Sequence, residues 1–316
     1  MKREFQYILC NGSGNRFVLI DAVAQAQQLL GVELSALART VCAPEALATD
    51  GLLLLVRDAA GYAMRMFNTD GSEAEMCGNG IRCVARLAAR YFPMQDFELQ
   101  SGGRVYRLSK QIPIFEDIPT YSVEIPVTLQ TDDFPRSETH PFLNQLIPEL
   151  DETLLFTYIN VGNPHLVACV EHLDIERLKL LGERVTTLKT LFPKGINVSF
   201  FRCDGAQSLF VATYERGVGL TSSCGTAMTA SSSAACLLDK CSAGVSIDVR
   251  NRGGMVRCCC QQGEELVTAL TGNATFEAFG QFDYLGALDG CIKLKNTEPQ
   301  EDEAAMYLRF VASVRC

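Results

Sequence analysis

The stretch Asn68-Thr-Asp-Gly-Ser-Glu-Ala-Glu-Met-Cys-Gly-Asn-Gly-Ile-Arg-Cys83 is the one around which the rest of the chain is arranged. It has a counterpart in the second half, Glu215-Arg-Gly-Val-Gly-Leu-Thr-Ser-Ser-Cys-Gly-Thr-Ala227. In both, a cysteine (Cys77 or Cys224) is followed by glycine, a small polar residue and another small residue. A helix-forming run comes next in each, at 81–91 and 228–238. The doubled pattern predicts two similar halves, each with one thiol at the start of a helix.

The start of a helix favours negative charge, because its first backbone N–H groups lack partners and carry a partial positive charge. A thiolate is stabilised there, so we expect its pKa to fall from about 8.5 toward neutrality. The same N–H groups can hold a substrate carboxylate, and glycines permit close approach. The candidate binding residues after the two thiols are Gly78, Asn79, Gly225 and Thr226.

Two such thiols suit proton transfer on both faces of an amino acid. A thiolate on one side of the α-carbon can remove its proton, while a thiol on the other side returns one. Cys77 and Cys224 are therefore the candidate catalytic residues, and this chemistry needs no cofactor. Most cysteines only pack in protein interiors, but the repeated context argues against a packing role for these two.

The same residues resemble a known family. Asn68-x-Asp-Gly-Ser-x-x-x-x-Cys-Gly-Asn-Gly-x-Arg82 is similar to the signature of diaminopimelate epimerases, and Glu215-Arg-Gly-x-Gly-x-Thr-x-x-Cys-Gly-Thr226 resembles its second half. The resemblance covers most of the chain and ends after Tyr284. It implies a reaction that interconverts LL- and meso-2,6-diaminoheptanedioate, feeding lysine and cell-wall synthesis.

Strand-like alternation with one long helix per half predicts an α+β fold. The resemblance implies two similar domains related by a pseudo-two-fold axis. Each would be a mixed or antiparallel sheet wrapped around a central helix, with the active site in the cleft between the domains. The first domain is expected at 1–128, completed by 276–316, and the second at 129–275. The polar stretch 130–138 is the linker candidate.

Composition excludes several other classes. A chain of 316 residues, 47% hydrophobic, can form one large domain or two ordinary ones. Its net charge of −9 argues against nucleic acid or an anionic membrane as partner. The N-terminus lacks a signal-peptide core, and the apolar run 52–56 is too short to span a bilayer. We therefore expect a soluble cytoplasmic protein acting on a small amino acid, with a homodimer as a possible assembly.

The cysteine content also indicates a cytoplasmic protein. The chain has fourteen cysteines, no Cys-x-x-Cys pair and three histidines. Without an export signal, reduced thiols in the cytosol are expected rather than disulfides, and no metal site is expected. The run 258–260 cannot point all three side chains one way in an extended chain, so it indicates strand packing.

Local patterns predict the remaining elements. Helices are expected at 32–41 and 179–192. Strands and hairpins are expected at 5–8, 17–22, 51–57, 62–68, 97–108, 121–127, 154–160, 196–202, 209–214, 245–260 and 266–271. In the tail, 296–304 is acidic and loop-like, and 306–314 is strand-like.

Four asparagines and a histidine match substrate-site positions of the family. Residues 11–17 read Asn-Gly-Ser-Gly-Asn-Arg-Phe, where the family usually has His-Gly-Leu-Gly-Asn-Asp-Phe, so Asn15 is implied as a contact. The turn Gly162-Asn-Pro-His165 supplies Asn163 and places His165 near the thiols. Asn68 and Asn197 match further substrate asparagines.

Glu215 and Arg216 form a charged pair shortly before the second thiol. Arginine can grip a carboxylate through two parallel hydrogen bonds, and glutamate can accept from an ammonium group. A substrate with a second amino-acid end needs both, together with the asparagine amides. The resemblance assigns the pair to the stereocentre that does not react, whereas an ordinary charged pair is a surface ion pair.

Several positions depart from the family pattern and bear on specificity. They are Arg16 in place of an acid, Leu220 in place of a glutamate, Ser223 in place of alanine, Ala227 in place of glycine, and Asn273 in Thr271-Gly-Asn-Ala274 in place of proline. The alternatives are a related racemase of another amino acid such as histidine, a non-catalytic amino-acid-binding protein, and a dithiol redox protein.

Overall fold

The protein is described by a computed structural model that places residues 2–129, 134, 141–286 and 291–314. The chain forms two compact units. The first contains the residues up to Val123 together with Thr271–Val314, and the second contains Glu124–Leu270. Both boundaries fall inside strands, β8 (Thr120–Val127) and β17 (Leu266–Asn273). Apart from Phe134, the expected linker at 130–138 lies outside the described residues.

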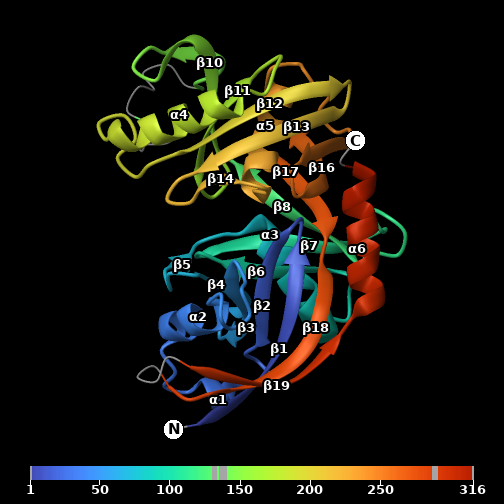
Figure 1. The fold of residues 1–316 in the computed structure, drawn as a ribbon. Helices are drawn as coiled ribbons and strands as arrows, with labels where there is room; N and C mark the ends of the chain where they lie inside the picture. Colours follow the sequence, from blue (N-terminus) through green and yellow to red (C-terminus); the bar gives the residue numbers. More distant parts are fainter. Residues whose placement is uncertain (1, 130–133, 135–140, 287–290, 315–316) are drawn as a thin grey trace. The chain divides into compact units, whose positions relative to one another are not determined.

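The first unit is a mixed sheet with four α-helices and a short 3-10 turn among its described residues (Figure 1). Its elements in chain order are β1 (Arg3–Gly12), β2 (Asn15–Asp21), α1 (Ala26–Leu29), α2 (Leu34–Cys42), β3 (Gly51–Asp58), β4 (Gly61–Asn68), β5 (Glu73–Ala74), α3 (Gly78–Ala88), η1 (Ala89–Tyr91), β6 (Asp96–Ser101), β7 (Arg104–Gln111), the start of β8, the end of β17, β18 (Thr275–Tyr284), β19 (Ile292–Pro299) and α6 (Glu301–Val314).

The second unit is also a mixed sheet with helices. Its elements are β9 (Gln145–Ile147), β10 (Asp151–Asn160), β11 (Pro164–Cys169), α4 (Ile175–Thr187), β12 (Asn197–Gly205), β13 (Ser208–Glu215), β14 (Gly219–Thr221), α5 (Gly225–Leu237), β15 (Ile247–Asn251) and β16 (Gly254–Gln262), completed by parts of β8 and β17.

The two units repeat one order of elements. Each has a hairpin, a helix, a second hairpin, a short strand, a buried helix and a third hairpin. The pairing repeats too: β2 runs parallel to β3 as β11 does to β12, and β4 runs parallel to β6 as β13 does to β15. The α+β fold with two similar halves, expected from the doubled cysteine pattern, is confirmed.

The buried helix of each unit is α3 or α5. Every residue of α3 except Arg86 is buried, and every residue of α5 except Leu237. In α5 the side chains are mostly alanine, serine and threonine, which let strands pack closely on all sides. The buried hydroxyls of Thr229, Ser232 and Ser233 donate to carbonyls four residues earlier at 2.8–2.9 Å, so burial leaves them satisfied.

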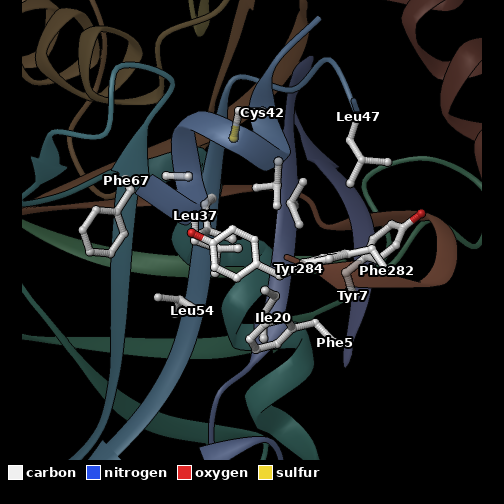
Figure 2. Packing of buried hydrophobic residues seen from close by; sticks show 14 of the residues in the cluster. Phe5, Tyr7, Ile20, Leu37, Cys42, Leu47, Leu54, Phe67, Phe282 and Tyr284 are labelled. Carbon is white, nitrogen blue, oxygen red and sulfur yellow. The ribbon is translucent and has the colours of Figure 1, made fainter. Parts of the chain in front are cut away.

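The first unit has a continuous apolar core, shown in Figure 2. Phe5 and Tyr7 of β1 pack on Phe282 of β18, with ring centroids 5.4 and 5.7 Å apart. Leu37 of α2 and Leu54 of β3 join the same cluster. This core fixes β1 and β2, whose connecting turn lies at the candidate site.

The tail differs from its expected structure. The span 306–314, expected as a strand, belongs to helix α6, and 296–304, expected as a loop, forms the end of β19 and the first turn of α6. Tyr307, Phe310 and Val311 are buried at helical spacing. Glu301, Asp302 and Glu303 suit a helix N-terminus. The polar side chains of β19 suit an edge strand that pairs with β18.

Two further observations concern surface and packing. Within the described residues no helix has the length and hydrophobicity to cross a membrane. The run 258–260 lies in β16, with Cys258 and Cys260 buried and Cys259 partly exposed, so the predicted strand packing is confirmed.

Candidate active site

Cys77 is the N-cap of α3, as expected from the sequence. Its backbone is extended (φ −139°, ψ 107°), and its Sγ accepts a hydrogen bond from the Gly80 N–H at 3.3 Å. The side chain is partly exposed. A Cβ on Gly80 would lie 2.9 Å from a methyl group of Leu53, so that side chain would have to move to admit one. A helix-start N–H therefore points at a reachable sulfur.

Asn79 and Asn15 meet beside this thiol. The Asn79 side-chain amide donates to Asn15 Oδ1 at 2.6 Å, so the first turn of α3 is joined to the start of β2. Asn15 Nδ2 in turn lies 3.4 Å from Asp50 Oδ2. Asn68 ends β4 and donates to Ser72 Oγ at 2.9 Å within the β4–β5 turn. Asn15 and Asn79 form one cluster with the helix start, and Asn68 is held separately.

Cys224 is the N-cap of α5 with nearly the same backbone (φ −137°, ψ 108°). Its Sγ lies 3.4 Å from Thr226 Oγ1, and the residue is only 7% exposed. Burial raises the pKa of this thiol well above its ordinary value, and the neighbouring Glu215 carboxylate raises it further. The expectation of a lowered pKa was therefore wrong for Cys224. Desolvation of the charged form outweighs the Thr226 and backbone hydrogen bonds that favour it.

The other candidates of the second unit form one chain of contacts. Asn163 lies 3.3 Å from Thr226 Oγ1, and its amide is 3.1 Å from His165 Nε2. His165 Nε2 is also 3.3 Å from Asn197 Nδ2. Asn197 Oδ1 accepts from the Arg216 backbone N–H at 2.9 Å. The structure thus connects Arg216, through two asparagines and a histidine, to the threonine beside Cys224.

These contacts indicate which side-chain atoms carry hydrogens. His165 is fully buried; burial, and after it the charge of Arg216, lowers its pKa to about 3, so the ring is neutral. Because Asn197 Oδ1 faces the Arg216 N–H, its amide nitrogen faces His165, and Nε2 must accept. The Asn163 side-chain nitrogen donates to Thr226 Oγ1 at 3.3 Å. The Thr226 hydroxyl therefore keeps its own hydrogen for the Cys224 sulfur, which lies 3.4 Å away.

Glu215 and Arg216 end β13 with different surroundings. The Glu215 carboxylate accepts from Thr221 Oγ1 at 2.5 Å and lies beside the Cys224 sulfur. Arg216 is exposed, and its guanidinium donates to the Lys194 carbonyl at 2.9 Å. Thr221 thus supports the Glu215 carboxylate, and the Lys194 backbone supports the Arg216 guanidinium.

Sequence patterns alone did not predict the residues whose hydrogen bonds hold the β1–β2 turn and the start of α3 next to Cys77. They are Asn11, Ser13, Arg82, Asn273 and Glu277. Three of them, Asn11, Ser13 and Asn273, are positions where the sequence departs from the family pattern. These departures are the signal that could have identified them. Arg16, which stands in place of the family's acid, pairs with Glu277 at 2.6 Å. Among the described residues no group of three or more histidine, cysteine or carboxylate side chains is placed to hold a metal ion.

The fold is one found among amino-acid epimerases. A hydroxyproline epimerase from Agrobacterium vitis with bound trans-4-hydroxy-L-proline matches at TM-score 0.64 and 16% identity, over 91% of this chain and 95% of that one. A PhzF-family phenazine biosynthesis protein from Bacillus anthracis matches at TM-score 0.65 and 15% identity, over 90% and 99%. At these identities the likeness concerns the fold alone. On this fold the chain carries a thiol at the start of each buried helix.

Sequence comparison is more specific. Residues 7–109 and 157–277 match the family described as "Diaminopimelate epimerase". The diaminopimelate epimerase of Lactiplantibacillus plantarum is 36% identical over 97% of this chain and 98% of its own length. That of Enterococcus faecalis is 35% identical over 96% and 97%. The chain belongs to the diaminopimelate epimerase family.

Proposed function

We propose that the protein is an isomerase that interconverts LL- and meso-2,6-diaminoheptanedioate, with Cys77 and Cys224 as acid and base. The observation that carries this is the repeated placement of a cysteine as N-cap of the buried helix, in equivalent positions of two similar units. Family membership supports the substrate.

The two thiols differ in a way that suits opposite roles. Cys224 is buried with a raised pKa and begins as the protonated thiol, the acid. Cys77 is partly exposed, and a helix-start N–H donates to its sulfur, which suits a thiolate base. In one direction Cys77 takes the α-proton as the Cys224 proton is delivered to the opposite face of the carbon. The product leaves Cys77 protonated and Cys224 ionised, ready for the reverse reaction.

Both thiolate states need support from neighbouring donors. When Cys224 is ionised, the Thr226 hydroxyl and the Ala227 N–H remain in place to donate to its sulfur. The first-turn N–H groups around Gly78 and Gly225 are positioned to hold the substrate carboxylate and to favour negative charge at the reacting carbon. Proton transfer between two thiols and carbon needs no cofactor, and we propose that none is used.

Glu215 and Arg216 are proposed to bind the distal end of the substrate, together with Asn15, Asn68, Asn163 and Asn197. Arg216 is the cation for the distal carboxylate, and the Glu215 carboxylate is the acceptor for the distal ammonium. Binding energy far from the reacting carbon places that carbon between acid and base. His165 holds Asn163 and Asn197 in orientation and is not itself an acid or base in this scheme.

The test is α-hydrogen exchange in deuterated water. Unmodified protein should incorporate one deuteron into diaminoheptanedioate and interconvert its isomers without added pyridoxal phosphate. Cys77→Ala and Cys224→Ala should each remove essentially all epimerisation, because one base cannot serve both faces of the carbon. Near-normal turnover in either variant would contradict the mechanism. Gln25→Ala, which changes a buried amide that bonds Gln6 in the first half of β1, is the matched control.

A substrate panel separates the main alternative, a related racemase of a one-ended amino acid. The fold neighbours include a hydroxyproline epimerase and a probable proline racemase, so the fold does not determine the substrate. Arg216→Ala should lower kcat/KM for diaminoheptanedioate a hundredfold or more, as expected when a charged partner is lost. Faster racemisation of histidine or another one-ended amino acid by unmodified protein would overturn the assignment.

We place this activity in the cytoplasm, in the route to lysine and cell-wall precursors. The described cysteines are free thiols, which fits a reducing compartment. The homodimer stays a prediction, to be checked by sedimentation equilibrium.

A further inference from the structure

The turn between β1 and β2 holds one buried residue, Ser13, in an unfavourable backbone conformation. Gly12 and Asn15 pair across it, and Ser13 and Gly14 form its tip. Ser13 has φ 52°, in the left-handed region that residues with a Cβ seldom adopt, and it is only 1% exposed. Such a conformation persists only where the surroundings hold it firmly, and it is found mainly at functional sites.

Asn273, at the end of β17, is one of the groups that hold the turn. Its Oδ1 accepts from the Ser13 N–H at 2.8 Å, and its Nδ2 donates to the Asn11 carbonyl at 3.1 Å. Nδ2 also lies within 3.1 Å of Asn11 Oδ1 and 2.9 Å of Thr275 Oγ1. Asn273 is fully buried. Because both ends of its amide are used, the side chain fixes the turn in one position.

Arg82 carries that position to the first turn of α3. It is fully buried, and its guanidinium donates to Ser13 Oγ and to the Gly78 carbonyl, both at 2.8 Å, and to Asn79 Oδ1 at 3.1 Å. Gly272 makes room for it, since a Cβ there would lie 3.0 Å from the guanidinium. One cation thus joins the strained turn to the two residues that follow Cys77.

The turn and the helix also touch directly. A Cβ on Gly12 would lie 2.5 Å from the Asn79 carbonyl oxygen, so only glycine allows this approach. The outer side of the turn is held by Glu277, whose carboxylate accepts from Asn11 at 3.1 Å and from Arg16 at 2.6 Å. The turn cannot shift without moving the first turn of α3.

We propose that Asn273 is a positioning residue for Cys77. By holding the strained Ser13 turn against Arg82, it fixes the α3 N–H groups that face the Cys77 sulfur and the Asn15–Asn79 pair beside it. Asn273 acts only through these groups and does not contact substrate. The catalytic part of this inference rests on the proposed function, since it assumes that Cys77 is a reacting group.

The first experiment is alkylation of Cys77 by iodoacetamide, followed by peptide mapping across a range of pH without substrate. In Asn273→Ala the Gly80 N–H is no longer held toward the sulfur, so the thiolate is less favoured. We expect the pH profile of Cys77 alkylation to move upward by about one unit, while that of Cys224, in the other unit, is unchanged. We also expect kcat to fall roughly tenfold with KM nearly constant, because the base is misplaced rather than the substrate lost.

Two companion variants keep the result decisive. Ser13→Gly removes the hydroxyl that accepts from Arg82 but suits a positive φ, so it should fold and show a smaller shift in the same direction. Gln25→Ala removes another buried amide, the N-cap residue of α1, which bonds the backbone N and O of Gln6 in β1, and should lower Tm without moving the Cys77 profile.

An unchanged Cys77 profile in both Asn273→Ala and Ser13→Gly would overturn the proposal and leave Asn273 with a role in stability alone. The proposal would also be overturned if Gln25→Ala moved the pH profile of Cys77 alkylation as much as Asn273→Ala does. Absence of α-hydrogen exchange in unmodified protein would instead count against the proposed function. The substrate-free alkylation comparison would still decide whether Asn273 positions Cys77.

Discussion

At the scale of single residues, His165 is the group whose chemistry depends most on its surroundings. It is fully buried, accepts through Nε2 and has a pKa lowered to about 3, first by burial and then by Arg216. In the unfolded chain an ordinary histidine has a pKa near 6.5. Between these two values the unfolded state binds a proton that the folded state does not, so the free energy of unfolding rises with pH.

His165→Gln should remove this dependence. Glutamine is uncharged, and its side-chain oxygen can still accept from Asn197. Between pH 7.5 and pH 5 the unmodified protein should lose about 2 kcal/mol more unfolding free energy than the variant, since one pKa unit is worth about 1.4 kcal/mol. Urea unfolding at both pH values measures this. His172→Gln, which changes a more exposed histidine, is the control; equal losses in His165→Gln and unmodified protein would show that His165 is protonated in the folded state.

The positions of the candidate site residues were more predictable from the sequence than the pKa values of their side chains. Both cysteines were expected at helix starts because Cys-Gly-polar-small patterns precede helix-forming runs, and α3 and α5 begin there. The raised pKa of Cys224 was not predictable, because burial and the Glu215 carboxylate act through the folded surroundings. The same holds for Asn273, whose partners lie at the opposite end of the sequence.

At the scale of elements, an ion pair between Arg86 and Glu303 attaches α6 to α3. Arg86, the one residue of α3 that is not buried, donates to both carboxylate oxygens of Glu303. Glu303 also accepts from the Phe276 N–H at 2.7 Å, and the Arg86 guanidinium lies 3.9 Å from the Phe276 ring. Both charged side chains are about four-fifths buried. The tail thus braces α3 against β18.

Glu303→Gln should weaken this brace. The neutral amide leaves the Arg86 charge without its partner in a largely buried position, and hydrogen bonds to charged groups are worth about 1.5–3 kcal/mol. We expect the free energy of unfolding to fall by about 2 kcal/mol, measured as a lower urea midpoint. Glu301→Gln, in the same helical turn but exposed, should change it by less than about 0.5 kcal/mol. Equal effects in the two variants would mean that the contact with Arg86 contributes nothing.

Prediction of elements failed in the tail for an identifiable reason. Alternating apolar and polar residues, together with glycine-rich turns such as Ser101-Gly-Gly103, predicted the hairpins and buried strands. The tail has a narrow apolar face of Tyr307, Phe310 and Val311, which is meaningful only once the surface of β18 is known. Its acidic first turn has the composition of a loop, but acidic residues are also favoured at a helix N-terminus.

At the scale of the whole molecule, the repeat of elements accounts for why two thiols arise in one chain. Each unit builds the same hairpins and the same buried helix, so each presents one cysteine in the same backbone conformation. Two equivalent thiols can serve the two faces of one carbon, which a single unit cannot do. The arrangement of the units required by this chemistry can be tested through the thiols themselves.

Hydrogen peroxide provides that test: the proposed mechanism requires the two thiols to flank one carbon atom, so we expect them to reach bonding range when no substrate is bound. The reachable Cys77 should react first, giving a sulfenic acid and water. Attack by Cys224 then forms the disulfide and releases a second water. We expect activity to be lost, a Cys77–Cys224 peptide to be found by mass spectrometry, and dithiothreitol to restore both thiols and activity. Cys203→Ser, which removes an exposed thiol elsewhere, should behave like unmodified protein. If peroxide leaves activity intact, or removes it without forming this link, the two thiols do not face one another and the two-base arrangement is wrong.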